Sequence, residues 1–287
     1  MITAEHVETA PASPPRARRR ARRALRACAA CFGLALVVGA VLFGIAWSHR
    51  GAHEASIDKA IKNFREHHGA STPGLLRPLS GVYTFVGTGT EHLSLLSTSQ
   101  HWGPRIPVTV TQENDGCWTF RVDYSTNHWQ STRYCPKGTV LRETGEETFQ
   151  SFDFVALTVS DLNDVTCNPP IDRLRIAAKP GATWQVACEG RSKSRGTRFH
   201  ARGSDSFVGV ERVKVGHELV PAYRYHVDRA LTGSQSGYER YDIWYSVLDG
   251  LPIRTTRSVL VKSPSPIGTV TYKESGEYVI SSLTPQR

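Results

Sequence analysis

The pattern that decides the fold of this chain lies in residues 117–135, which read CWTFRVDYSTNHWQSTRYC. Apolar and polar residues alternate on both sides of Ser125-Thr126-Asn127, as expected of two antiparallel strands joined by a tight turn. Cys117 and Cys135 are equidistant from Thr126, so the hairpin places them opposite each other, within reach of a disulfide. We therefore predict a Cys117–Cys135 bond.

The hairpin register also predicts which face of the first strand is buried. One face carries Thr119, Arg121 and Asp123, and the other carries only apolar and aromatic side chains. Because a one-residue slip would turn every apolar side chain toward solvent, we expect the second face to be the inner one. Residues 223–227 and 241–245 alternate in the same way. The predicted inner face consists of Trp118, Phe120, Val122, Tyr124, Tyr223, Tyr225, Tyr241, Ile243 and Tyr245.

This aromatic inner face has two interpretations. It is either the packed core of a barrel or sandwich, or the lining of a cavity that binds an apolar ligand. Under the second interpretation, the nine inner residues are the candidate ligand-binding residues.

The period of two continues from Gly81 to Ile280, and no second long helical period interrupts it. We expect an all-β domain built as a curved antiparallel meander or half-open barrel. Residues 160–181 are predicted to be the least regular part, because Pro169, Pro170 and Pro180 interrupt any strand there. The predicted strands are residues 81–88, 106–112, 117–124, 128–135, 147–155, 183–190, 207–215, 219–229, 238–248, 253–262 and 268–280.

One amphipathic helix is predicted before the strands. Ile57, Ala60, Ile61 and Phe64 recur at helical spacing after Ser56, which is a good N-cap residue. Because an exposed spacer would not need an apolar stripe, we expect the helix to dock on the β-domain. The alternative is a stalk helix at a membrane surface.

Residues 27–47, ACAACFGLALVVGAVLFGIAW, carry no charge and are long enough to span a bilayer as a helix. Seven arginines precede this run in residues 16–26. By the positive-inside rule, the N-terminus is predicted to be cytoplasmic. A cleaved signal peptide is the rival interpretation, but the run is long and no A-x-A site ends it.

These features divide the chain into four predicted parts. They are a basic cytoplasmic tail (1–26), a single transmembrane signal-anchor helix (27–48), a juxtamembrane helix and linker (49–80), and an extracytoplasmic β-domain (81–287). The predicted location is therefore the plasma membrane, in a single-pass orientation.

Charge and cysteine content limit the function classes. The chain carries a formal charge of +9, but residues beyond 50 hold 27 basic and 24 acidic residues, so we do not expect this part to bind nucleic acid. Four cysteines in the extracytoplasmic part suggest two disulfides in an oxidising compartment. By elimination, the second bond joins Cys167 and Cys188. The preference for Arg over Lys suggests a bacterial cell-envelope protein.

Motifs for catalysis or metal binding are incomplete in this sequence. His53-Glu54 and His217-Glu218 begin like a zinc-protease motif but lack its second histidine. Residues 233–237 resemble a nucleophile elbow with Gln235 in place of the serine. We therefore predict no enzyme activity, no metal site and no cofactor.

One acidic group could in principle supply a catalytic carboxylate pair, as in glycosidases. It consists of Glu143, Glu146, Glu147 and Asp153. Solvated strand ends are the preferred interpretation of this group.

Residues 244–254, WYSVLDGLPIR, resemble the late hairpin of the LolA/LppX-like lipoprotein-carrier superfamily, where an aromatic strand ends in a G-L-P turn. The order of anchor, helix and antiparallel meander is also similar. The resemblance implies a half-open barrel whose concave apolar face holds acyl chains, with helices as a lid. An uncleaved span and two disulfides depart from that pattern. A carrier that is fixed to the membrane can bind or hand over a lipid, but it cannot shuttle the lipid alone.

The leading hypothesis is a membrane-anchored extracytoplasmic protein that binds a lipid or lipoprotein acyl chain. The alternative is a non-enzymatic envelope interaction or sensing module, with a packed core and a protein partner. A hydrolase is the third possibility.

Overall fold

The computed structural model describes residues 52–69, 71–94, 98–153, 158–265 and 268–287. The chain divides into two units, residues 1–50 and 51–287. The predicted cytoplasmic tail and transmembrane helix lie outside the described residues. Among the helices that are described, none has the length and hydropathy needed to cross a bilayer.

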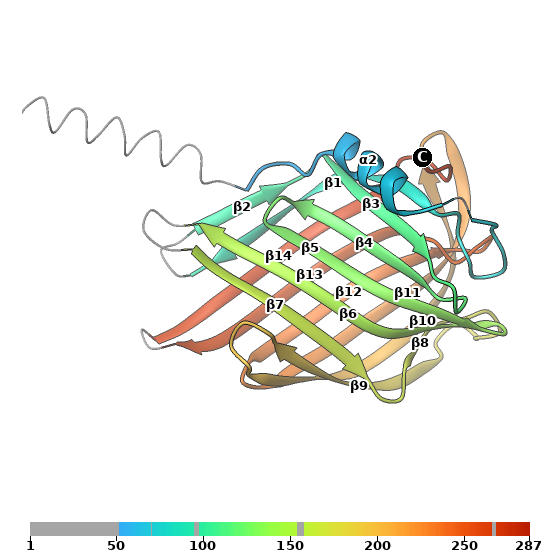
Figure 1. Cartoon of the computed structure of the whole chain (residues 1–287). Coiled ribbons are helices and arrows are strands. Elements are labelled where there is room, and N and C mark those ends of the chain that lie inside the picture. The colour runs from blue at the N-terminus through green and yellow to red at the C-terminus, as the bar shows by residue number, and fades with distance from the viewer. Residues whose placement is uncertain (1–51, 70, 95–97, 154–157, 266–267) are drawn as a thin grey trace, which may run out of the picture. The chain divides into compact units, whose positions relative to one another are not determined.

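The described part is all-β with one short helix, α2 (Ile57–His67). Figure 1 shows the strands as a single sheet that curves round on itself. The strands are β1 (Gly81–Leu93), β2 (Thr98–Trp102), β3 (Arg105–Gln112), β4 (Trp118–Ser125), β5 (His128–Lys137), β6 (Val140–Asp153), β7 (Thr158–Cys167), β8 (Ile171–Arg175), β9 (Thr183–Ser192), β10 (Arg198–Val215), β11 (Glu218–Gly233), β12 (Ser236–Ser246), β13 (Pro252–Ser265) and β14 (Gly268–Ile280).

Twelve antiparallel strands form a closed barrel, while β2 and β8 pair with β1 and β6 outside the main circuit. The circuit closes where β1 pairs with β14, from Phe85 opposite Ile280 to Leu93 opposite Tyr272. The prediction of a half-open barrel is therefore wrong. Closure is physically favourable because it leaves neither end strand of the meander with an unpaired edge.

The hairpin at residues 117–135 forms in the predicted register. Trp118 lies opposite Tyr134 and Asp123 opposite Trp129, with a register shift beside the turn. The buried face of β4 is the predicted one. Both predicted disulfides are present, Cys117–Cys135 and Cys167–Cys188. The second joins directly opposite residues of β7 and β9.

The expectation that residues 160–181 are irregular is wrong. They contain most of β7 and all of β8, and the prolines lie outside these two strands. Asp161 and Asn163 line the barrel interior together with Val159 and Val165. The strand was missed because its inward residues are partly polar, so the apolar alternation that marks a strand is lost.

Helix α2 docks on the barrel as predicted. The Ser56 hydroxyl accepts a hydrogen bond from the Lys59 backbone N–H at 3.2 Å and caps the helix. Ile61 and Phe64 are buried against Val82 of β1. The apolar stripe of α2 therefore covers an outward-facing residue of the barrel wall.

The two ends of the barrel differ. We call the end where β1 begins the base; it is filled by a packed core that includes Leu76, Leu141, Leu174, Leu251 and Trp118. We call the opposite end, where β6, β11 and β13 end, the mouth (Figure 1). The candidate site lies between them.

Candidate functional site

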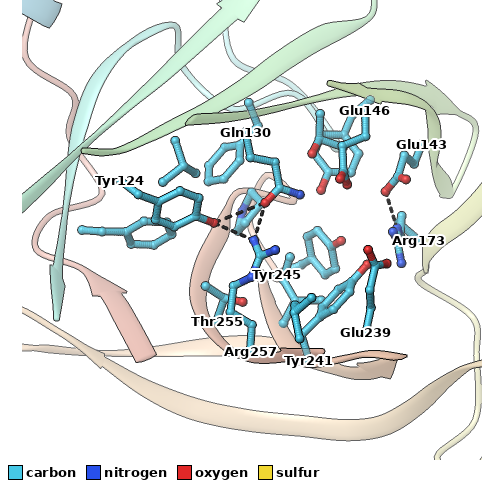
Figure 2. A pocket seen from close by; sticks show the side chains of 18 residues that line it. Tyr124, Gln130, Glu143, Glu146, Arg173, Glu239, Tyr241, Tyr245, Thr255 and Arg257 are labelled. Atoms are coloured by element: carbon cyan, nitrogen blue, oxygen red, sulfur yellow. Dashed lines mark hydrogen bonds and ion pairs between the residues drawn. The ribbon is translucent and has the colours of Figure 1, made fainter. Parts of the chain in front are cut away.

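The barrel interior contains an inner chamber, a cavity of about 60 Å³. Figure 2 shows how aromatic and charged side chains from opposite walls surround it. Its apolar lining includes Phe85, Phe120, Ile243 and Val259. The chamber is therefore partly apolar and partly charged.

A second, outer chamber of about 140 Å³ continues toward the mouth. Its apolar wall is made of Leu93, Phe152, Val159, Val165, Phe199, Leu231, Val259, Val261, Val270 and Tyr272. Polar residues near the turns, including Arg195, Gln235 and Ser263, also line it. Apolar walls with a polar margin are the usual composition of a small-molecule site.

Four residues line both chambers, and we call them the waist: Glu146 of β6, Glu239 of β12, and Arg257 and Val259 of β13. The two chambers are thus successive parts of one hollow. The waist places three charged side chains inside a space that apolar residues otherwise dominate.

Six of the nine candidate ligand-binding residues meet in the inner chamber: Phe120, Val122, Tyr124, Tyr241, Ile243 and Tyr245. The other three lie in the packed core at its margin. Trp118 is 0% exposed, packs against Tyr134 in a tilted arrangement with a centroid distance of 4.6 Å, and donates from Nε1 to the Leu76 carbonyl at 2.9 Å. These contacts assign Trp118 to the core.

Tyr223 and Tyr225 also pack in the core. The Tyr225 hydroxyl accepts a hydrogen bond from the Arg175 backbone N–H at 2.9 Å, and burial raises the pKa of Tyr225 to about 12. Both rings pack on Phe207. The inner face identified from the sequence therefore serves as core at the base and as cavity lining further along.

Sequence reasoning missed a buried ion network beside the inner chamber. Arg173 of β8 contacts Glu143 at 2.5 Å and Asp205 at 2.9 Å, and Arg229 lies 3.4 Å from Asp205 (Figure 2 shows the first pair). Glu143 is 2% exposed, so the interpretation of the acidic group as solvated strand ends is wrong for this residue. In the local sequence, the only sign of this ion network is a charged residue at a position of a strand that faces inward.

A second network lies on the β13–β14 side of the interior. Arg257 pairs with Glu274 at 2.6 Å and donates to the Tyr124 hydroxyl at 2.8 Å. Burial raises the pKa of Tyr124 to about 12, although the positive charge of Arg257 opposes the shift. Glu91 is similarly buried, 3.3 Å from the His128 ring.

Glu146 and Glu239 at the waist have no ion pair among the described residues. Burial, together with the negative charges of Glu143 and Glu239, raises the pKa of Glu146 to about 7, while Arg257 and Arg173 oppose the shift. The charge on Glu146 therefore changes near neutral pH.

The Tyr245 side chain supplies a further polar group to the inner chamber. It is 0% exposed, and its hydroxyl has no hydrogen-bond partner of normal geometry among the described residues, although the Tyr134 hydroxyl lies near it. Figure 2 shows this hydroxyl directed into the chamber. Groups of three or more His, Cys, Asp or Glu residues able to hold a metal do not occur in the described ranges.

Comparison with protein-family models, curated proteins and solved structures finds no match for this chain. The β-barrel fold is compatible with a ligand-binding protein. The two chambers are therefore the features from which a function can be inferred.

Proposed function

We propose that the barrel binds an amphipathic ligand, such as a lipid or a lipoprotein acyl chain, in its interior. The observation that carries this proposal is the apolar wall of the outer chamber, which continues into the inner chamber at the waist. Burying an apolar chain there is favoured by about 0.8 kcal/mol for each CH2 group removed from water. The ligand's apolar part lies in the outer chamber and its polar end reaches the waist.

The opposite face of the wall supports this assignment. Ion pairs such as Arg240–Asp228 and Arg254–Glu277 lie on the outer face and are accessible to water. Large apolar side chains of the same strands, such as Val259 and Ile243, face inward instead. On β12 and β13 the large apolar side chains are therefore concentrated inside the barrel.

Site-specific photocrosslinking in cells tests the proposal. A benzophenone amino acid at Phe152 lies on the outer chamber, whereas the same group at Phe149 faces the outside of β6, beside Trp129. Mass spectrometry of the full chain should reveal a lipid adduct at position 152 and none at position 149. Equal adducts at both positions, or none at either, would contradict ligand binding inside the barrel.

We also propose that the protein is anchored in the membrane, that its β-domain is extracytoplasmic and that it is not an enzyme. The anchor and its orientation are supported by the uncharged run at residues 27–47 and the arginines before it. A reporter that is active only outside the cytoplasm, fused after Arg287, should be active. A mature chain that begins near Ala52 would instead indicate a secreted protein.

A protein-interaction module is the second candidate function. It is favoured by exposed apolar side chains on the hairpin of β10 and β11, where Val208, Val210 and Leu219 are about half exposed. Scattered apolar residues are common on protein surfaces, so this observation is weaker than the continuous apolar chamber. Crosslinking from Val210 to a specific envelope protein, without any lipid adduct at position 152, would favour it.

A further inference from the structure

The charged groups of the barrel interior are unbalanced in favour of carboxylates. The interior acids are Glu91, Glu143, Glu146, Asp161, Asp205, Glu239 and Glu274. The interior bases are Arg173, Arg229, Arg257 and His128, while Arg195 is exposed at the mouth. A buried charge is costly unless it is paired or neutralised. The interior therefore carries more negative charge than its own cations balance.

The arginines are already committed to particular carboxylates. Arg173 and Arg229 pair with Glu143 and Asp205, and Arg257 pairs with Glu274. Three interior carboxylates have no ion pair in the described part of the chain. Asp161 of the outer chamber accepts a hydrogen bond from the Ser192 hydroxyl at 2.6 Å, whereas Glu146 and Glu239 line both chambers. The excess negative charge thus lies where a ligand in the hollow would end.

An independent feature of the same chamber is the buried Tyr245 hydroxyl. It has no hydrogen-bond partner of normal geometry among the residues that the structure describes, although the Tyr134 hydroxyl lies near it, and it is directed into the inner chamber (Figure 2). A phenol oxygen there can accept a hydrogen bond from an N–H donor. The phenol rings of Tyr241 and Tyr245 also line the chamber, and such rings attract cations.

We propose that the waist recognises a protonated amine or guanidinium group at the polar end of an amphipathic ligand, held between Glu146 and Glu239 with the Tyr245 hydroxyl as a further acceptor. This inference rests on the proposed function, because it names the head group of the same ligand. An organic cation fits better than a bare metal ion, since no metal-binding group of three side chains converges within the described ranges.

Matched eight-carbon probes test the inference on the full chain in phosphatidylcholine nanodiscs, with empty nanodiscs subtracted. Isothermal titration calorimetry compares octylammonium, octanol and octanoate, which share a tail and differ in charge. Octylammonium should bind at least about tenfold more tightly than octanol, equivalent to about 1.4 kcal/mol, and octanoate should bind most weakly. Octanoate binding as tightly as octylammonium would overturn the inference.

The Glu146→Gln/Glu239→Gln double variant should lose the preference for octylammonium while still binding octanol. Its matched control is Glu147→Gln, because Glu147 is the next residue on β6 and forms an outer ion pair with Lys193. The control should keep the preference. Loss of the preference in both proteins, or in neither, would overturn the inference.

Dependence on pH gives a second readout. Glu143, Glu239, Arg257 and Arg173 are the charged groups that face Glu146 from β6, β12, β13 and β8. Octylammonium, like a lysine amine with a pKa of about 10.4, stays protonated between pH 6 and 8, so its binding should strengthen as Glu146 ionises. A flat profile in the wild-type protein would contradict the inference.

The octanol arm separates the two proposals. If octanol binds but the amine is not preferred, the head-group inference fails while ligand binding in the barrel stands. If none of the three probes binds, the proposed function fails together with the inference. Because Gln is nearly isosteric with Glu, we expect the variants to fold. Thermal unfolding of each variant checks that the barrel is intact.

Discussion

Trp102 Nε1 donates a hydrogen bond to the Tyr278 hydroxyl at 2.8 Å, across 176 residues of sequence. The two side chains lie over the seam where β1 and β14 close the barrel, and each packs on a glycine, Trp102 on Gly89 and Tyr278 on Gly276. Gly89 and Gly276 are themselves opposite each other in the β1–β14 pair. Glycines leave room at the seam, and the aromatic rings fill it.

Gly89→Ala should destabilise the barrel because the added Cβ would overlap the Trp102 indole. We expect a loss of about 1–3 kcal/mol in the free energy of unfolding, measured by urea denaturation. Gly145→Ala is the matched strand control, since its Cβ would make only an ordinary contact, 3.5 Å from the Val165 carbonyl. Equal losses for the two variants would show that Trp102 does not require the glycine.

Arg173→Met should be strongly destabilising because it leaves Glu143 and Asp205 buried without their shared cation. Breaking a buried pair in this way typically costs about 3–5 kcal/mol. The control is Arg240→Met at the exposed Arg240–Asp228 pair, where the cost should be below about 1 kcal/mol. Chemical denaturation of both variants measures the difference, and similar costs would contradict a structural role for the network.

Glu146 should make stability depend on pH. Its pKa is raised from 4.5 to about 7 in the folded protein, so the folded state binds a proton more readily than the unfolded state. The resulting stability is fully present below pH 4.5 and is lost as the pH rises through 7; we expect a loss of roughly 1–3 kcal/mol. Denaturant midpoints across this range should fall less in Glu146→Gln than in wild type, whereas Glu147→Gln should follow the wild-type curve.

Trp118→Ala and Phe120→Ala should separate core from cavity lining on a single strand. Truncations of this kind cost about 3–5 kcal/mol. Trp118 should lie at the upper end, because it loses the Tyr134 contact and the Leu76 hydrogen bond. Phe120 faces the inner chamber and should lie at the lower end, with a larger change in probe affinity than in stability. A greater cost for Phe120 in thermal melts would show that the chamber is packed.

Local features of the sequence were sufficient to predict individual elements. The position of the turn between Cys117 and Cys135 gave the hairpin register and the disulfide, because the geometry of a tight turn determines which residues face each other. Ser56 and the stripe ending at Phe64 gave α2, since capping and helical periodicity act within a few residues. The aromatic alternation of β4 and β12 predicted many of the side chains that line the barrel interior.

Closure of the barrel and the chemistry of its interior were decided only by the tertiary structure. Pairing of β1 with β14 depends on residues nearly two hundred positions apart, and no local pattern in either strand identifies its partner. Glu143, Arg173 and Asp205 come from three strands, and each by itself resembles an ordinary surface charge. Only their mutual proximity compensates the cost of burial, so the fold, and not the local sequence, determines that these groups face inward and leave Glu146 and Glu239 unpaired beside an apolar chamber.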